Sequence, residues 1–443
     1  MPSATQSAPK SMYRDKEGLG VWEHRGKVAA VGIGASPTAR RWDETPENSI
    51  GAWAILSIRK ALEDAGVSPD QVDGIVMDPH ATTGDVWEGP IPESFAKAFQ
   101  LTDNPLDGIS SLSTEFILKN MPELKNVNFS MYGPGCMSNA LNVVSQAIGD
   151  GLAHTCLVVK AWNNNAGRYG HGGTQAVDTV GGAAAFKMPW GLRGGIEEIA
   201  FTFDQYCRKY GKSHDGLAPF AVNQRRNGLM NPDGFYYQNR PETLTIEDYV
   251  AGRWIAKPMN IYDCDMPIQV AVAYLFTTAE RAKDMKQKPV YILNHVANHP
   301  KVRSTLETID EVEASQDSLA RKIYEGSGVT ANDVDVLNPY DGFLQFTGYY
   351  LEGFGWRGVK KGEALDFYAG DISVEGPNPF SPSGGNNGSG RTRWWMHTDS
   401  IQQLQGRAGQ RQVKIKNGRP EIAISGGPMP MGGNWTVWGT SPD

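Results

Sequence analysis

The chain has 443 residues, of which 40% are hydrophobic and 21% charged, a balance typical of a globular protein and not of a fibrous or disordered one. Its length exceeds one ordinary core and predicts two or three domains. The net charge of −7 argues against nucleic acid as the main partner.

The N-terminal residues and the cysteines indicate the cellular compartment of the protein. Residues 1–23 are polar, without the apolar core of a secretory signal, and no run is long enough to span a bilayer. We therefore expect a cytoplasmic protein without a membrane partner. The cysteines, at positions 136, 156, 207 and 264, form no CxxC pair, so they predict neither a disulfide framework nor a metal site.

Buried-type strands and amphipathic helices alternate through the first 161 residues. Hydrophobic periodicity predicts strands at 27–34, 72–77, 127–132 and 155–161, and helices at 49–65, 93–99 and 139–148. Such alternation is typical of a largely parallel sheet covered by helices on both faces.

The middle of the chain begins with the glycine-rich stretch 163–195, which has no periodicity and is too long for a simple connection. It predicts a loop region that covers a site. After it we predict helices at 199–210, 218–228 and 245–255, the last with Thr245 as its N-cap, and strands at 270–276 and 290–293.

The C-terminal part again combines strands and helices. Its pattern predicts strands at 334–337, 412–415 and 421–425, helices at 343–350 and 394–404, and a glycine- and serine-rich turn at 381–390.

An internal duplication relates the two halves. Residues 59–73 align without a gap on residues 321–335, with Arg, Lys, Glu, Gly, Val, Val and Asp at the same offsets. Each copy is typical of a helix that ends near a glycine, followed by a turn and a strand. We infer two similar α/β halves.

The first candidate for chemistry is Tyr340-Asp341, at the end of a predicted strand. Open α/β proteins place reactive side chains at such turns, and a carboxylate beside a phenol can tune its proton transfer. The alternative is a buried structural tyrosine with Asp341 as a helix N-cap.

Three further stretches contain candidate residues. Cys136 follows a Gly-Pro-Gly turn at a predicted helix start, which favours a nucleophile, although an unreactive thiol in a tight turn fits equally. The loop 383–391 offers backbone N–H groups for an oxyanion or another anion, with Arg391 and Arg393 adding positive charge, or is only a flexible connection. His171 lies among glycines and is more simply a surface histidine.

Together these motifs resemble the thiolase superfamily, and within it the sterol-carrier and lipid-transfer-protein-like branch, to which 262–267 and 277–282 are also similar. The resemblance implies two duplicated α/β halves that form a five-layer αβαβα core. The implied boundaries are an N-terminal extension at 1–26, a first domain at 27–285 with a loop insertion at about 162–260, and a second domain at 286–443.

The departures from thiolases indicate the activity. Thiolases use a cysteine nucleophile and two histidines, but Tyr340 occupies one histidine position and no Gly-His-Pro follows Gly384-Gly385. The nucleophile position falls on Pro134, two residues before Cys136. This pattern resembles the thiolase-like aldolases that cleave steroid and bile-acid side chains as CoA thioesters, whose Tyr-Asp-Gly-Phe motif matches 340–343.

The resemblance implies a retro-aldol reaction without a covalent acyl-enzyme and without a cofactor other than the CoA thioester. Tyr340 would be the base, tuned by Asp341, and Tyr249 could replace a second tyrosine that some relatives carry near position 390. Backbone around Gly384 and Gly385 or Gly427 would hold the enolate. The implied binding residues for the CoA ester are Gly384, Gly385, Asn386, Arg391, Gly427 and Arg253, with Arg225 and Arg226 as further candidates for its phosphates.

The resemblance also implies a homodimer that works with a separate small subunit containing an OB-fold and a zinc ribbon. Two rival functions stay open: acyl transfer with Cys136 as the nucleophile, and a non-catalytic scaffold that binds acyl-CoA or lipid.

Overall fold

The computed structural model describes residues 20–78, 86–133, 139–164, 185–192, 195–298, 308–415, 418–427 and 433–443. Two sequence-predicted candidates, Cys136 and His171, lie outside these ranges, as does most of the N-terminal extension. Within the described ranges, no helix is long and apolar enough to cross a membrane.

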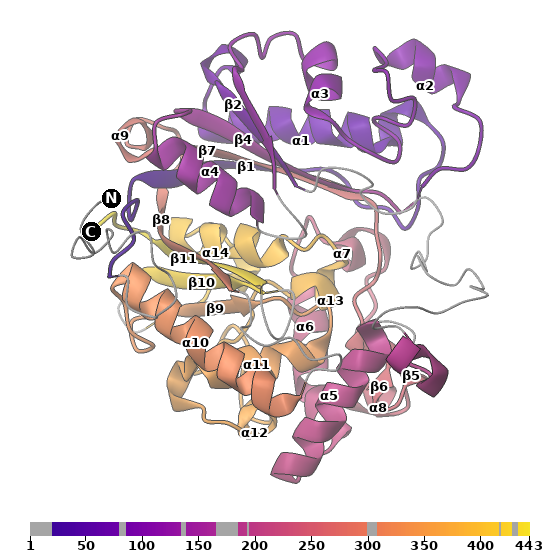
Figure 1. The fold of residues 1–443 in the computed structure, drawn as a ribbon, viewed down its shortest axis with the longest axis vertical. Coiled ribbons are helices and arrows are strands. Elements are labelled where there is room, and N and C mark those ends of the chain that lie inside the picture. The colour runs from indigo at the N-terminus through magenta and orange to yellow at the C-terminus, as the bar shows by residue number, and fades with distance from the viewer. Residues whose placement is uncertain are drawn as a thin grey trace, which may run out of the picture.

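Five layers make up the molecule (Figure 1). Helix α1 (Ile50–Ala65) covers one face of the first half's strands, and α10 (Ile309–Ser327) covers the strands of the second half on the opposite side. Between the two sets of strands lie α4 (Asn139–Gly149) and α14 (Trp395–Gln405). The αβαβα arrangement expected from the resemblance is confirmed.

Nine strands pair edge to edge across both halves, in the order β3-β2-β4-β7-β1-β8-β11-β10-β9. The two halves meet where β1 pairs antiparallel with β8. The strands of this sheet are β1 (Val28–Ala35), β2 (Gly74–Asp78), β3 (Phe129–Tyr132), β4 (Thr155–Trp162), β7 (Val270–Thr278), β8 (Val290–Asn298), β9 (Val336–Pro339), β10 (Ile422–Gly426) and β11 (Gly433–Gly439).

The expectation of a largely parallel sheet is wrong. Only β2–β3, β2–β4 and β9–β10 run parallel among the pairs of this sheet, whereas β1, β7, β8 and β11 pair antiparallel with their neighbours. A buried apolar run shows that a strand is covered on both faces, but its direction depends on the end at which the chain enters the sheet. The long segment between β4 and β7 returns the chain to the opposite end of the sheet, so β7 runs antiparallel to β4.

The remaining elements are helices and one two-stranded ribbon, β5 (Trp254–Ala256) with β6 (Met259–Asn260). The other helices are α2 (Glu93–Ala98), α3 (Thr114–Asn120), α5 (Gly195–Tyr210), α6 (Ala218–Gly228), α7 (Phe235–Asn239), α8 (Ile246–Val250), α9 (Ala279–Ala282), α11 (Leu344–Phe354), α12 (Ala364–Tyr368) and α13 (Gly385–Ser389).

Two predicted elements need correction. Thr245 does cap α8, but the helix stops at Val250 and Ile255 belongs to β5, because residues 251–253 turn the chain into the ribbon. Residues 412–415 are not a strand: the Val413 N–H donates to the Gln403 side chain at 2.8 Å and not to a neighbouring strand.

The duplication is visible in the structure. Helices α1 and α10 both end at a glycine in the left-handed conformation, Gly66 with φ 71° and Gly328 with φ 72°. Asp73 accepts the Thr155 N–H at 2.8 Å at the start of β4, and its counterpart Asp335 accepts the Glu421 N–H at 2.7 Å just before β10. The same carboxylate therefore fixes the same pair of neighbouring strands in each half.

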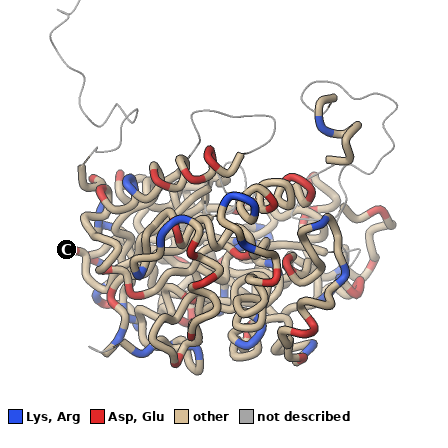
Figure 2. Tube along the Cα trace, turned by 90° about the horizontal axis from the view of Figure 1, so that it is seen from below, with Lys and Arg blue, Asp and Glu red and all other residues tan. Residues whose placement is uncertain are grey.

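Charged residues of both signs are interspersed along the trace (Figure 2). Among the buried contacts between the halves, Trp394 Nε1 donates to the Asp78 carboxylate at 2.6 Å, at the end of β2.

Candidate active site

Three chain segments that are distant in sequence meet at the end of β9. The Asp265 N–H donates to the Gly342 carbonyl at 2.9 Å, and the Arg391 N–H donates to the Met266 carbonyl at 2.8 Å. Tyr340 is tied to the end of β10 because its N–H donates to the Gly426 carbonyl at 2.7 Å. Backbone hydrogen bonds thus hold the turn that carries Tyr340 against the segment 264–267 and the loop that follows α13.

Tyr340 follows the last residue of β9, as the sequence predicted, and its side chain is buried with 3% of its surface exposed. A β-carbon on Gly342 would lie 1.9 Å from the Tyr340 hydroxyl oxygen and 2.7 Å from Asp265 Oδ2. Only glycine leaves room there, so phenol and carboxylate approach each other over the Gly342 backbone.

The surroundings of Tyr340 keep its phenol protonated. Burial raises the pKa of Tyr340 well above its ordinary value, and the Asp265 carboxylate raises it further. Arg393 and Arg391 act in the opposite direction without cancelling the effect of burial on this pKa. At neutral pH, Tyr340 is therefore a proton donor.

Asp341 holds the glycine-rich loop. Its carboxylate accepts the Asn386 N–H at 2.6 Å, the Asn387 N–H at 3.2 Å and the Gln224 side-chain amide at 2.6 Å. Burial raises the pKa of Asp341 to about 6, although these hydrogen bonds favour the charged form. The capping role weighed for Asp341 is thus real, but the capped helix is α13 and not the helix that follows Asp341 in the chain.

The loop glycines allow this close approach. A β-carbon on Gly385 would lie 2.0 Å from Asp341 Oδ2, and Gly384 has φ +69°. The N–H groups expected to hold an enolate already have partners: Gly385 donates to Ser383 Oγ at 2.9 Å and Gly427 donates to the Asn434 carbonyl at 3.0 Å. An enolate at these positions would have to replace those bonds.

Asn386 shapes the turn that follows α13. Its side-chain oxygen accepts the N–H groups of Thr392, at 3.0 Å, and of Arg393. Arg393 has φ 66°, a left-handed conformation that costs a non-glycine residue free energy and that these bonds help to maintain. The guanidinium of Arg393 lies over the Trp162 ring, 4.5 Å from its centroid.

Arg391 forms a buried ion pair with Asp265. Its Nε and Nη2 atoms both lie 2.9 Å from Asp265 Oδ1, and Asp265 is 2% exposed. The sequence analysis assigned Arg391 to the CoA ester; in the structure its guanidinium orients the carboxylate beside Tyr340.

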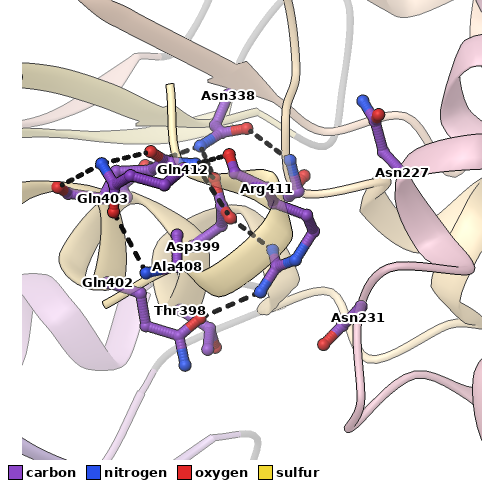
Figure 3. Close-up of polar contacts among 12 residues, drawn as sticks. Asn227, Asn231, Asn338, Thr398, Asp399, Gln402, Gln403, Ala408, Arg411 and Gln412 are labelled. Carbon is purple, nitrogen blue, oxygen red and sulfur yellow. Dashed lines mark hydrogen bonds and ion pairs between the residues drawn. The ribbon is translucent and has the colours of Figure 1, made fainter. Parts of the chain in front are cut away.

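Behind the site, Asn338 connects β9 to a buried polar cluster (Figure 3). Its amide donates to Asp399 at 3.0 Å, and its carbonyl oxygen accepts the Ser383 N–H at 3.4 Å. Asp399 is paired with Arg411. The strand end, the glycine-rich loop and α14 are thereby fixed to one another two residues before Tyr340.

Tyr249 belongs to a different cluster. Its hydroxyl donates to Asp263 and lies 2.9 Å from His214 Nε2, and the Tyr249 and His214 rings stack at 5.1 Å. Burial and Asp263 raise the pKa of Tyr249 well above its ordinary value. Among the described residues, the Tyr249 hydroxyl forms hydrogen bonds with Asp263 and His214 and none with Tyr340.

A cavity of about 810 Å³ reaches the site from the inserted region. Asp265 forms part of its wall. Arg225 and Arg253 line it as well, whereas Arg226 pairs with Glu375. Its lining residues are Arg40, Ile196, Arg225, Tyr236, Arg240, Glu242, Thr243, Leu244, Asp248, Arg253, Ile255, Ile261, Tyr262, Cys264, Asp265, Met266, Pro267 and Asn387.

Arg225 brings a buried positive charge to this cavity. It is 7% exposed, and its guanidinium stacks 3.5 Å from the centroid of the Tyr236 ring. Its Nη1 donates to the Glu242 carbonyl at 3.2 Å, while its Nε has no hydrogen-bond partner within the described residues. Burial lowers the pKa of Arg225 because it removes water from the charged guanidinium, and an anion in the cavity would offset this loss.

Sequence reasoning missed Asp265, Gln224 and Asn387. Asp265 lies in the segment 262–267, which was noticed as part of the resemblance but received no role. Gln224 is an ordinary helix residue in sequence, and only the fold brings it to Asp341.

Comparisons with known proteins identify similar sequences and similar folds. Residues 297–428 match the family described as thiolase C-terminal domain-like. A 17-hydroxy-3-oxo-4-pregnene-20-carboxyl-CoA lyase of Mycobacterium tuberculosis is 29% identical over 82% of this chain and 87% of its own. A steroid side-chain-cleaving aldolase of Thermomonospora curvata is 26% identical over 82% of this chain and 86% of its own.

Solved structures show the same fold. An Ltp2-ChsH2(DUF35) aldolase superposes with a TM-score of 0.73 at 21% identity, over 94% of this chain and 98% of that one. Human mitochondrial 3-ketoacyl-CoA thiolase gives 0.58 at 13% identity, over 94% and 99%. The chain has the thiolase fold. In sequence it is similar to the lyase and the steroid side-chain-cleaving aldolase named above, which confirms the resemblance stated from its motifs.

Proposed function

We propose that the protein is a carbon–carbon lyase that cleaves a β-hydroxyacyl-CoA with a bulky, steroid-like acyl group into a ketone or aldehyde and a short acyl-CoA. The observation that carries this proposal is Tyr340, where thiolases have a histidine, which lies beside Asp265, a residue of the wall of a large cavity. Similarity to a lyase and an aldolase that act on steroid side chains supports it.

The reaction needs a proton removed from the β-hydroxyl and a negative charge stabilised on the departing thioester enolate. Tyr340 supplies a buried phenol for proton transfer. Arg391 and Arg393, whose charges act on Tyr340, supply positive potential for the enolate. No cofactor takes part in this scheme.

The cavity fits a long substrate, since ligand pockets commonly have volumes of about 300–1,000 Å³. Arg240 and Arg253 are exposed at its wall, while Asp265 is buried. We assign the phosphates of the CoA ester to Arg253 and Arg240, and the thioester to the Asp265 end. Gly384, Gly385, Asn386 and Gly427 then form the loop framework around the reacting carbons.

The first test is to incubate the protein with a β-hydroxy steroid-side-chain CoA thioester and to follow ketone and short acyl-CoA by mass spectrometry. Cleavage without added free CoA is expected. Cleavage that requires free CoA would instead be thiolysis, and Cys136→Ala should then abolish it.

Tyr340→Phe is expected to lower kcat by about 10²–10⁴, the usual contribution of a positioned acid or base. CoA-ester binding, measured by calorimetry, should persist because the phenyl ring fills the same space. Unchanged turnover in this variant would favour another role for Tyr340, and binding without any turnover in the wild type would favour the scaffold.

We also propose a homodimer that associates with a separate small OB-fold subunit in the cytoplasm. Strand β3 forms one edge of the sheet, and its Met131 and Tyr132 are 48% and 37% exposed. A sheet edge with exposed apolar side chains suits pairing with a second copy. The description of one similar structure as an Ltp2-ChsH2 aldolase supports a partner subunit.

A further inference from the structure

Asp265 is the acidic side chain that joins the cavity to Tyr340. It lines the cavity wall, and its Oδ2 atom shares with the Tyr340 hydroxyl the space over Gly342. Its other oxygen is fixed by two guanidinium nitrogens of Arg391. The carboxylate therefore has one oxygen held by Arg391, while the other lies near the Tyr340 hydroxyl over Gly342.

Asp341, the carboxylate next to Tyr340 in sequence, has a different task. Both of its oxygens accept hydrogen bonds from α13 or from Gln224, which hold the loop. Asp341 is also not among the residues that line the cavity, whereas Asp265 is, so Asp265 is the carboxylate placed to meet a substrate.

We propose that Asp265 is the base that removes the β-hydroxyl proton and that Tyr340, as a neutral phenol, protonates the enolate. This inference rests on the proposed function and reverses the role first expected for Tyr340. A carboxylate at the cavity wall can accept a proton from a substrate hydroxyl, whereas a buried phenol can donate one.

Asp265 and Tyr340 together account for every proton that the reaction transfers. As Asp265 takes the β-hydroxyl proton, the O–H electrons form the ketone C=O bond and the Cα–Cβ electrons pass to the thioester enolate. The enolate carbon then takes the Tyr340 proton to give the short acyl-CoA. The resulting phenolate recovers a proton from the carboxyl group of Asp265, and both residues return to their starting states.

The pH dependence of kcat/KM in the unmodified protein separates the two assignments. If the Tyr340 phenolate were the base, kcat/KM would rise about tenfold per pH unit between pH 7 and 9, because the pKa of Tyr340 is raised. With Asp265 as the base, kcat/KM should stay level over this range. A tenfold rise per unit would overturn the proposal.

The groups around Asp265 leave this window clear. Among the described residues, Tyr340, Asp341, Cys264 and Arg391 interact with Asp265, and Arg393 acts on Tyr340. The arginines stay charged, Asp341 titrates below the window, and burial raises the pKa of the Cys264 thiol beyond it.

Variants add a second measurement. Asp265→Asn should lower kcat by about 10²–10⁴ and change KM by less than about threefold. Asp317→Asn, the same substitution at a surface ion pair with Lys361, should leave both constants unchanged. A kcat within threefold of the wild type in Asp265→Asn would sink the proposal.

A readout independent of turnover distinguishes failure of this inference from failure of the proposed function. With ¹³C-labelled tyrosine, the Cζ resonance of Tyr340, assigned by its loss in Tyr340→Phe, should move in Asp265→Asn and stay in place in Asp317→Asn. An unmoved resonance would show that the two groups do not interact, even if the chosen substrate were not cleaved at all.

Discussion

At the scale of single residues, the site contains two carboxylates near one phenol with different environments. Asp265 is paired with Arg391, while Asp341 is enclosed by neutral hydrogen-bond donors. The backbone and amide donors only partly offset burial, so the pKa of Asp341 is raised and that carboxyl group carries a cost when ionised.

This cost predicts a pH-dependent stability. The pKa of Asp341 is about 6 in the folded protein, against 3.8 for an exposed aspartate, so the folded state retains a proton that the unfolded state has lost. The free energy of unfolding due to Asp341 therefore falls as pH rises from about 4 to 6, by about 2 kcal/mol.

Asp341→Asn cannot titrate, so the stability of the wild type relative to this variant should fall by about 2 kcal/mol between pH 4 and pH 7. Denaturant unfolding of both proteins at the two pH values measures it. Other buried acids affect both proteins alike and cancel. A difference that is constant with pH would contradict the raised pKa.

At the scale of elements, the site depends on the contact between α6 and α13. Gly228 and Gly388 face each other there: a β-carbon on Gly228 would lie 1.8 Å from the Gly388 carbonyl oxygen. This contact sets α6, with Gln224 and Arg225, against the loop that Asp341 holds.

Gly228→Ala should therefore destabilise the protein by about 1–3 kcal/mol, the usual cost of overpacking a tight contact. It should also lower activity, because α13 must shift away from Asp341. Gly195→Ala is a matched control, since a β-carbon there has nothing within 4 Å. Equal melting temperatures for the two variants would argue against a rigid contact.

The elements also show what periodicity could and could not predict. The bounds of α6 matched the prediction, and both duplicated helices end at the expected glycines. Strand β11 was missed because glycine and tryptophan interrupt its pattern, although Trp435 and Trp438 are buried. The place of Tyr340 at the end of a strand was predicted correctly because neighbouring residues in the sequence indicate where a strand ends. The position of Asp265 beside it depends on backbone bonds between distant segments, which no local pattern encodes.

At the scale of the whole molecule, the exposed edge at β3 predicts self-association. Two copies paired along this edge would cover Met131 and Tyr132. Met131→Lys places a charge on the edge, a common device against edge pairing.

We expect Met131→Lys to shift the protein from dimer toward monomer in light scattering coupled to size exclusion, with little change in the unfolding of the monomer. The control is Leu152→Lys, at an exposed apolar side chain outside β3, which should leave the mass unchanged. A wild type that is monomeric at all concentrations would rule out the β3 dimer.

Duplication gave this chain two copies of the same strand end. Continued along the chain, the alignment of 59–73 with 321–335 places Asp78 opposite Tyr340. Asp78 accepts a hydrogen bond from Trp394 of the other half, whereas Tyr340 lies over Gly342 beside Asp265. One copy of the position therefore joins the two halves, while the other places a phenol beside the carboxylate of the candidate active site.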